Sequence, residues 1–402
     1  MSAVTEHVEA PGGWAGVAGI AVAQVVSWGS IYYTFSLFVG PMEQDLGWSR
    51  ATLNGALSLG LFAAGVAALP VGAHIDRHGG RALMSLGSLA AALLFAAWSG
   101  VDSVIAFYLL WLGLGITMAA TLYEPAFAVL TRKFPRSFRT RIAVVTLAGG
   151  FASTVFIPLG QGLIETLGWR DALMALGLIN LALGLPLHFL ALREPPRHAG
   201  RTAAKTSTGA LRRALHRPAF WGLALAYVIY SAAFSAVTFH LVLLLSEREL
   251  AMATVVGIFA LVGPAQVGGR IALMALGRRL TTSLAGRIVF VLFPLSILPL
   301  LAHGPLWSLV AFALLYGAAN GVMTIVRGAI LPDLFGHAGY GAISGAITMP
   351  SMIAKAAAPL GAALLWQAGG YDAVLWTVFA GGVIAAAGFW FAVSRPVAGS
   401  AG

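Results

Sequence analysis

The sequence predicts an all-α membrane protein whose helices cross the bilayer twelve times. Of its 402 residues, 59% are hydrophobic and only 9% are charged. Soluble proteins carry about 25% charged residues, so this composition is too apolar for a water-soluble domain. The apolar runs reach the roughly 20 residues that a helix needs to span the hydrocarbon core. They lack the alternating segments of about ten residues that are typical of membrane β-strands.

A basic segment in the middle of the chain separates the apolar runs into two sets of six. Residues 193–217 contain seven Lys or Arg residues and a Pro-Pro pair, which together indicate a linker. We therefore expect two six-helix bundles around a central cavity, with an N-terminal bundle at 1–192, a cytoplasmic linker at 193–217 and a C-terminal bundle at 218–402. The predicted spans are 14–40, 51–73, 82–100, 104–131, 140–163, 171–191, 219–245, 254–277, 284–302, 306–331, 341–367 and 373–394.

Basic residues are concentrated in alternate connections. Eighteen of the 24 Lys and Arg residues lie between spans 2 and 3, 4 and 5, 6 and 7, or 8 and 9, or after span 12, and three lie on the opposite side. Because cytoplasmic loops are enriched in Lys and Arg, both termini are predicted to be cytoplasmic. The net charge of +10 thus reflects membrane topology, and we expect no nucleic-acid partner.

The remaining three cations, Arg270, Arg327 and Lys355, interrupt predicted spans. A charge at the centre of a membrane helix costs about 2.5–3.5 kcal/mol on insertion scales, so each should have a partner or a ligand. A small anion is the simplest ligand for a group of buried cations. The alternatives are a structural contact for Arg270 and, for Lys355, a side chain that extends to the membrane interface.

Arg270 and Lys355 are the predicted anion-binding residues. The guanidinium group is planar and suits a carboxylate, and Gln266 lies one helical turn before Arg270 on the same face. Lys355 is near the middle of its span, among alanines that leave room for a ligand. Further candidates for the walls of the site are Tyr32, Tyr33, Asn54, Tyr230, Asn320 and Thr324. For Tyr32, Tyr33, Asn54 and Tyr230 the alternative is packing against lipid or at the interface.

Arg327 and Glu124 lie toward the cytoplasmic ends of spans 10 and 4, at corresponding positions of the two halves. One hypothesis is a gate in which the two side chains pair when the halves close on the cytoplasmic side. The alternative is local pairing of Glu124 with Arg132 or Lys133, and of Arg327 with Asp333. Glu124 is also the acid that could carry a coupling proton.

Other kinds of site find little support in the sequence. The chain has no cysteine, which excludes disulfides and thiolate metal ligands. His74 and His78 flank Asp76, but two histidines and one acid in a loop are a weak metal signal. We therefore predict no metal site and no cofactor. A phosphate-binding G-x-x-x-x-G-K-[ST] loop is absent from the sequence, so any transport would draw on a gradient.

The connection between spans 2 and 3 carries a recognisable motif. Residues 72–81 read Gly-Ala-His-Ile-Asp-Arg-His-Gly-Gly-Arg, which resembles the G-x-x-x-D-R-x-G-x-R loop of the major facilitator superfamily. In that family the loop holds the cytoplasmic side closed. The resemblance implies a gating role for Gly72, Asp76, Arg77 and Arg81.

A second stretch narrows the resemblance. Residues 35–50 read Phe-Ser-Leu-Phe-Val-Gly-Pro-Met-Glu-Gln-Asp-Leu-Gly-Trp-Ser-Arg and are similar to the first loop of monocarboxylate-transporter-like and oxalate–formate-antiporter-like members. Those antiporters bind carboxylates through an arginine in span 8 and a lysine in span 11, which here are Arg270 and Lys355. Tyr33 and Gln266 occupy the places of a lysine and an aspartate in the eukaryotic-type carriers.

The resemblance implies a secondary transporter that moves a small mono- or dicarboxylate by alternating access, through exchange or with a proton. It also implies a monomer in the cell membrane, the inner membrane in a bacterium, with the lipid bilayer as its other partner. One alternative is efflux of a drug, a toxic compound or an inorganic anion. Alternatives of another class are a receptor that does not transport, or a membrane-embedded enzyme, for which the sequence offers no catalytic cluster.

Overall fold

The computed structural model describes residues 13–192, 209–248, 250–277 and 280–394, and nearly all of them are helical. In the first bundle the elements are α1 (Gly13–Ser27), η1 (Trp28–Tyr33), α2 (Phe35–Leu46), α3 (Arg50–His78), α4 (Arg81–Ser99), α5 (Val104–Thr121), α6 (Tyr123–Lys133), α7 (Phe138–Gly149), α8 (Ala152–Leu167), α9 (Trp169–Ile179), η2 (Asn180–Gly184) and α10 (Leu185–Ala191). In the second they are α12 (Pro218–Ser246), α13 (Met252–Leu276), α14 (Thr282–Leu301), α15 (Leu306–Phe335) and α16 (Tyr340–Val393).

The described residues form eleven helical stretches that are long and apolar enough to cross a membrane. The longest, α16, contains non-helical backbone angles at Gly369 and Gly370, where φ is −158° and 68°. Glycine tolerates the left-handed region at no steric cost, so the chain turns here and α16 holds the eleventh and twelfth crossings. The prediction of an all-α fold with twelve membrane helices is confirmed.

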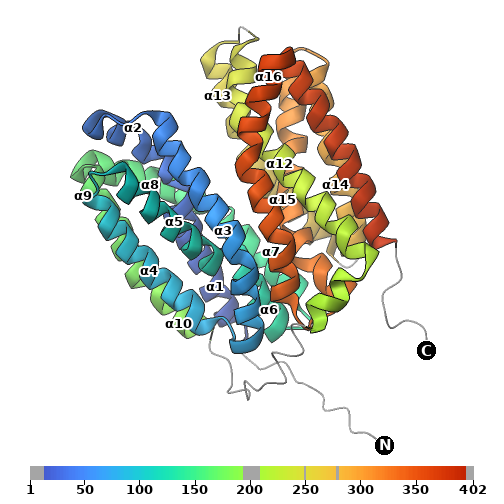
Figure 1. Cartoon of the computed structure of the whole chain (residues 1–402). Helices are drawn as coiled ribbons and strands as arrows, with labels where there is room; N and C mark the ends of the chain where they lie inside the picture. Colours follow the sequence, from blue (N-terminus) through green and yellow to red (C-terminus); the bar gives the residue numbers. More distant parts are fainter. Residues whose placement is uncertain (1–12, 193–208, 249, 278–279, 395–402) are drawn as a thin grey trace, which may run out of the picture.

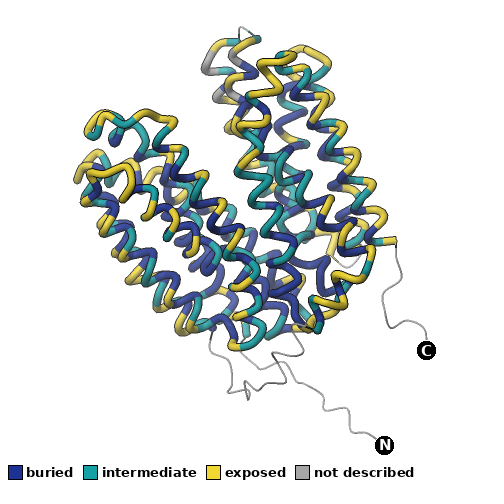
Figure 2. Tube along the Cα trace, in the orientation of Figure 1, coloured by how far each residue is buried: buried dark blue, intermediate teal, exposed yellow. Residues whose placement is uncertain are grey.

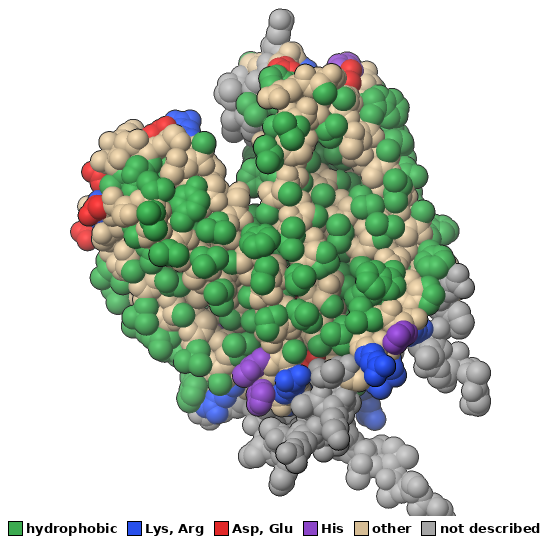
Figure 3. Space-filling model, in the orientation of Figure 1, with side chains coloured by type: hydrophobic (Ala, Val, Ile, Leu, Met, Phe, Trp, Pro, Cys, Tyr) green, Lys and Arg blue, Asp and Glu red, His purple; other side chains and the backbone are tan. Residues whose placement is uncertain are grey.

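The two bundles stand side by side and meet at one end only (Figure 1). Helices α6 and α7 lie at the base, where they contact α15 and α16 of the second bundle. Buried residues are concentrated in this lower part of the view, whereas the rims above carry many exposed ones (Figure 2). The molecule therefore has a closed end and an open end, and the space-filling view shows a hollow between the bundles at the open end (Figure 3).

Charge distinguishes the two ends (Figure 3). We call the closed end, formed by the α3–α4, α6–α7 and α15–α16 connections, the basic end, because Lys and Arg gather there. The opposite end, formed by the α2–α3, α4–α5 and α12–α13 connections, is called the acidic end.

Seven of the basic residues from which the orientation was predicted lie outside the described residues: Arg193, Arg197, Arg201, Lys205, Arg278, Arg279 and Arg395. Most of the predicted linker, at 193–208, also lies outside them.

The closed end depends on backbone contact between α3 and α16. A Cβ atom added to Gly72 would lie 1.9 Å from the carbonyl oxygen of Gly341, and one added to Gly341 would lie 2.2 Å from the oxygen of Gly72. One turn further on, a Cβ at Gly345 would lie 2.5 Å from the oxygen of Ala68. Small residues permit such close helix packing in membranes, so this seam joins the two bundles without intervening side chains.

Candidate functional site

A cavity of about 610 Å³ lies between the bundles. This size is within the roughly 300–1,000 Å³ that is typical of ligand sites. Both bundles contribute to its walls, and the side chains come from widely separated parts of the chain. The predicted residues that line it are Arg270, Lys355, Gln266, Tyr32, Tyr33, Tyr230, Asn320, Thr324, Glu124 and Arg327.

Asn54 is not part of this lining. The residue is exposed on the first turns of α3, at the acidic end, and its side-chain amide donates to the carbonyl oxygen of Arg50 at 2.8 Å. Its place among the wall residues is therefore corrected. Asn54 was predicted to line the site because it is a polar residue within an apolar run. A hydrogen bond to the preceding helical turn satisfies its side-chain amide instead.

Arg270 is buried, with 3% of its surface exposed, although it carries a full charge. Its Nε donates to the carbonyl oxygen of Gly321 on α15 at 3.3 Å. A Cβ at Gly150, just after α7, would lie 2.2 Å from Nη1 of Arg270, so the guanidinium group packs against the first bundle. Nη1 itself has no hydrogen-bond partner within the described ranges. A buried donor of this kind is costly unless something binds it.

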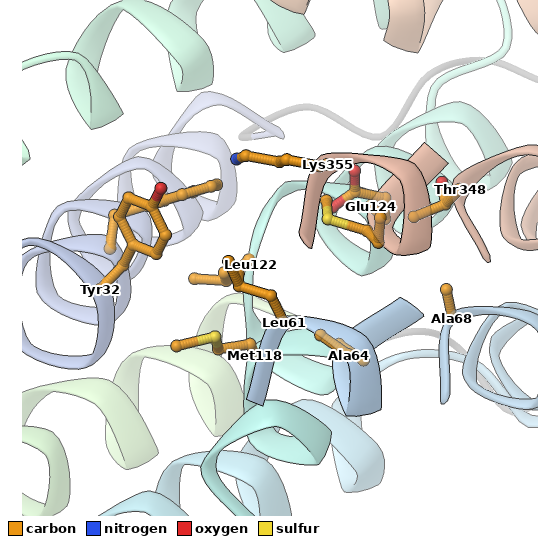
Figure 4. A pocket seen from close by; sticks show the side chains of 12 residues that line it. Tyr32, Leu61, Ala64, Ala68, Met118, Leu122, Glu124, Thr348 and Lys355 are labelled. Carbon is orange, nitrogen blue, oxygen red and sulfur yellow. The ribbon is translucent and has the colours of Figure 1, made fainter. Parts of the chain in front are cut away.

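Lys355 extends from α16 toward Tyr32 of the first bundle (Figure 4). Its Nζ lies 5.4 Å from the centre of the Tyr32 ring, close enough for a cation–π interaction. Among the residues that the structure describes, none forms an ion pair or hydrogen bond with this ammonium group. Like Arg270, it lines the cavity without a carboxylate to balance its charge.

Amide and phenol groups connect α12, α13 and α15 on one wall. The hydroxyl of Tyr230 donates to Oδ1 of Asn320 at 3.2 Å, and Nδ2 of Asn320 donates to Oε1 of Gln266 at 3.1 Å. The chain of bonds uses the oxygen of Gln266 and leaves its amide nitrogen available to the cavity. The hydroxyl of Thr324 donates to the carbonyl oxygen of Gly321 within its own helix. This wall therefore adds further polar groups beside Arg270.

Aromatic residues of the first bundle form the opposite wall, and two of them were missed by the sequence analysis. Trp28 and Tyr123 line the cavity with Tyr32 and Tyr33. The ring of Trp28 lies 5.4 Å from Tyr32, 6.1 Å from Tyr33 and 5.0 Å from Tyr123, centre to centre. The π-helical turn η1 brings three of these rings together. The i, i+4 spacing of Trp28 and Tyr32 was a signal, but the widened turn cannot be read from the sequence.

Two ion pairs join the bundles toward the basic end, and one of them, Arg327 with Glu124, lines the cavity. Nη2 of Arg327 lies 3.3 Å from Oε1 of Glu124 and donates to the hydroxyl of Thr348 at 2.9 Å. Asp333 pairs with Arg139 of α7, so it is not the partner of Arg327 that the local alternative required. The structure thus brings Glu124 and Arg327 together across the interface.

Asp76 joins the bundles at the basic end through the backbone. Its two carboxylate oxygens accept hydrogen bonds from the N–H groups of Gly341 and Ala342, both at 2.9 Å. These N–H groups belong to the first turn of α16, where the helix dipole favours a negative charge. The carboxylate therefore caps a helix of the other bundle, directly beside the contact between Gly72 and Gly341.

Arg81 of the motif differs from this pattern. Nε of Arg81 donates to the carbonyl oxygen of Phe189 at 2.8 Å, and its guanidinium group lies 3.8 Å from the centre of the Phe189 ring. Both contacts are within the first bundle, so the structure does not place Arg81 between the bundles. Arg77 lies in the last turn of α3. Arg132 donates to the carbonyl oxygen of Ile75 and so holds the end of that helix.

Comparison with known proteins gives a consistent result. Residues 20–286 match the sequence profile of the Major Facilitator Superfamily. The chain is 33% identical to human monocarboxylate transporter 11 over 121 residues, 29% of this chain and 25% of that protein. It is 29% identical to bovine monocarboxylate transporter 13 over 282 residues, 66% of this chain and 63% of that protein. These alignments thus span between a quarter and just under two thirds of the relatives' lengths.

The fold has solved counterparts. The crystal structure of the human organic anion transporter MFSD10 superposes with a TM-score of 0.74 at 20% identity, over 94% of this chain and all of that one. At this identity the likeness concerns the fold. Together with the profile match, it explains the twelve crossings, the paired bundles and the cavity between them. The chain belongs to the major facilitator superfamily of membrane transporters.

Proposed function

We propose that this protein moves a small organic anion, a mono- or dicarboxylate, across the cell membrane by alternating access. The observation that carries the proposal is the pair of cations in the cavity: the buried Nη1 of Arg270 and the ammonium group of Lys355 have no protein partner in the described ranges. A carboxylate would satisfy both groups. The names of the similar proteins, monocarboxylate and organic anion transporters, support this cargo class.

In this proposal the basic end faces the cytoplasm, as do both termini, and the cavity opens to the outside. The enrichment of Lys and Arg at the closed end supports this orientation. Glu124 with Arg327, and Asp76 with the start of α16, act as the cytoplasmic gate, because each contact crosses between the bundles and must break before that side opens. The protein is proposed to work as a monomer.

The two cations also suggest how transport is coupled. Without an anion, closing the cavity around Arg270 and Lys355 would bring two positive charges into a drier environment, which is unfavourable. A bound carboxylate lowers that cost, so the loaded protein changes conformation more readily than the empty one. This behaviour favours exchange of one anion for another. Coupling to a proton would use Glu124, which lines the same cavity.

A ligand screen on purified protein tests the cargo class. We expect a carboxylate at about 100 times its dissociation constant to stabilise the folded protein by about 2.7 kcal/mol and so to raise its melting temperature. In Lys355→Ala this increase should disappear, whereas Arg50→Ala, which removes an exposed cation paired with Glu43, should retain it. The proposal fails if no carboxylate raises the melting temperature, or if chloride, sulfate or phosphate alone does so.

Asp76→Asn tests the gate. An asparagine presents one oxygen and an NH₂ group, so one of the two N–H groups of α16 loses its acceptor and the helix dipole loses its counter-charge. We expect the closed basic end to weaken by about 1–3 kcal/mol. The chain has no cysteine, so a single reporter, Ser153→Cys in the cavity wall, can be labelled with an impermeant maleimide from outside. Labelling should decrease in Asp76→Asn, and unchanged labelling would contradict the gating role.

A further inference from the structure

We propose that the preferred cargo is an aromatic carboxylate, whose planar ring is held by the first bundle and whose carboxylate is held by the second. This inference rests on the proposed transport of an organic anion and specifies the chemical class. Aromatic residues line the cavity from both bundles, including Tyr227, Phe234 and Tyr316 of the second, but its lining cations come from the second bundle alone. The cations Arg270 and Lys355 come from α13 and α16, and the group of four rings comes from η1 and α6.

The ring-binding wall consists of Trp28, Tyr32, Tyr33 and Tyr123. Trp28 is the centre of this group, with its ring 5.0 to 6.1 Å from the other three. Its ring planes are tilted or edge-on to those neighbours. Aromatic rings attract one another in such offset and edge-to-face arrangements beyond the effect of buried area. A ligand ring that entered the cavity would extend a cluster that already has this geometry.

Trp28 also offers an unused hydrogen-bond donor. Its Nε1 is buried and has no acceptor in the part of the chain that the structure describes. The same is true of Nη1 of Arg270 on the opposite wall. Unsatisfied donors on residues that line one cavity from two bundles favour a ligand that reaches both sides and carries acceptor oxygens. A ring acid fulfils both conditions, whereas an acid of two or three carbons supplies the oxygens but no ring for the aromatic residues to contact.

The contact between Lys355 and Tyr32 favours a carboxylate position close to the aromatic group. Nζ of Lys355 lies over the face of Tyr32, at 5.4 Å from its centre, so the cation of the second bundle already reaches the aromatic wall of the first (Figure 4). A carboxylate bound to this ammonium group would place an attached ring beside Trp28 and Tyr32. A small space of about 30 Å³ adjoins these residues and is lined by apolar groups such as Leu61, Met118 and Leu122.

This division has a consequence for alternating access. A ligand shifts a conformational equilibrium only through its different affinity for the two states. The bundles approach each other when the cavity closes, so a ligand that touches both gains contacts in the closed form. A ring acid therefore promotes closure more than an aliphatic acid that binds the same cations with the same carboxylate.

Binding of benzoate and cyclohexanecarboxylate to the full-length purified protein tests the inference. The two acids share the carboxylate and the number of ring carbons, and the saturated ring is no less hydrophobic, so burial alone gives benzoate no advantage. We expect benzoate to bind roughly 2- to 13-fold more tightly, as a favourable pair of aromatic rings would produce. Dissociation constants can be measured by calorimetry in the same detergent buffer.

Two variants identify the aromatic wall as the cause. Trp28→Leu should reduce the preference to about one by weakening benzoate, with cyclohexanecarboxylate nearly unchanged. Trp28→Phe keeps a ring, removes the N–H donor and should retain most of the preference, which also shows that the position tolerates substitution. Equal binding of the two acids by the unchanged protein, or an undiminished preference in Trp28→Leu, overturns the inference and leaves carboxylate transport intact. If neither these acids nor aliphatic ones bind, the proposed function fails as well.

Discussion

Replacement of Arg270 by lysine is expected to weaken anion binding roughly 10- to 150-fold, corresponding to about 1.5–3 kcal/mol for hydrogen bonds to a charged group. The charge is conserved, but lysine is a point charge without the planar fork that grips a carboxylate. The present geometry depends on the fork. Nε donates to the carbonyl oxygen of Gly321 on α15 while Nη1 lies beside Gly150 of the first bundle, and one ammonium group cannot reproduce both directions.

The measurement is the dissociation constant of the best ligand, together with uptake into proteoliposomes. Arg50→Lys is the matched control, because this arginine lies at the exposed acidic end with Glu43 as its ion-pair partner. Its variant should bind and transport as the unchanged protein does. Retained affinity in Arg270→Lys would mean that the guanidinium group has a structural role and that the ligand is bound elsewhere.

Gly72→Ala is expected to abolish most transport by opening the basic end. The added methyl group would meet the carbonyl oxygen of Gly341 at 1.9 Å, and this atom belongs to the backbone of α16, which cannot move aside as a flexible side chain could. Overpacking costs about 1–3 kcal/mol, which corresponds to a roughly 5- to 150-fold change in a conformational equilibrium. The state with a closed basic end should therefore lose population.

Uptake and labelling of the Ser153→Cys reporter from outside should both decrease in this variant. Gly361→Ala is the control, because it changes a helical glycine of α16 that has open space at its Cβ position, and both signals should be preserved there. Gly341→Ala approaches the same seam from the other helix and should reproduce the defect. Normal uptake by Gly72→Ala would show that the seam is not closed during the transport cycle.

Much of the fold could be predicted because the bilayer imposes its own pattern on a sequence. Each crossing requires a long apolar run, and the break at Gly369–Gly370 lies between the two last predicted spans. The sequence could not predict helix boundaries that lie within a single membrane span. The widened turn of η1 and the interruption between α7 and α8 occur within continuous apolar runs, and tertiary packing rather than composition determines them.

Some residues of the candidate site could also be predicted from the sequence, and others could not. Arg270 and Lys355 were predictable because charge within an apolar run is costly and so needs a reason. Trp28 was not, because an aromatic residue in a membrane helix is equally suited to lipid, to packing or to a ligand. The partner of Asp76 is a pair of backbone N–H groups. Because almost every residue type has a backbone N–H, the sequence does not indicate which of them will bind a carboxylate.

The first half of α16 carries the start-of-helix N–H groups that Asp76 caps, then Thr348 beside Arg327, and then Lys355 in the cavity wall. From Gly341 to Lys355 this is one helix of roughly 20 Å. A ligand that displaces Lys355 would therefore also displace the start of α16, where Asp76 binds. By thermodynamic linkage, mutations that weaken the contact between Asp76 and α16 should also change the affinity for the cargo, although the mutated residues do not touch the cargo.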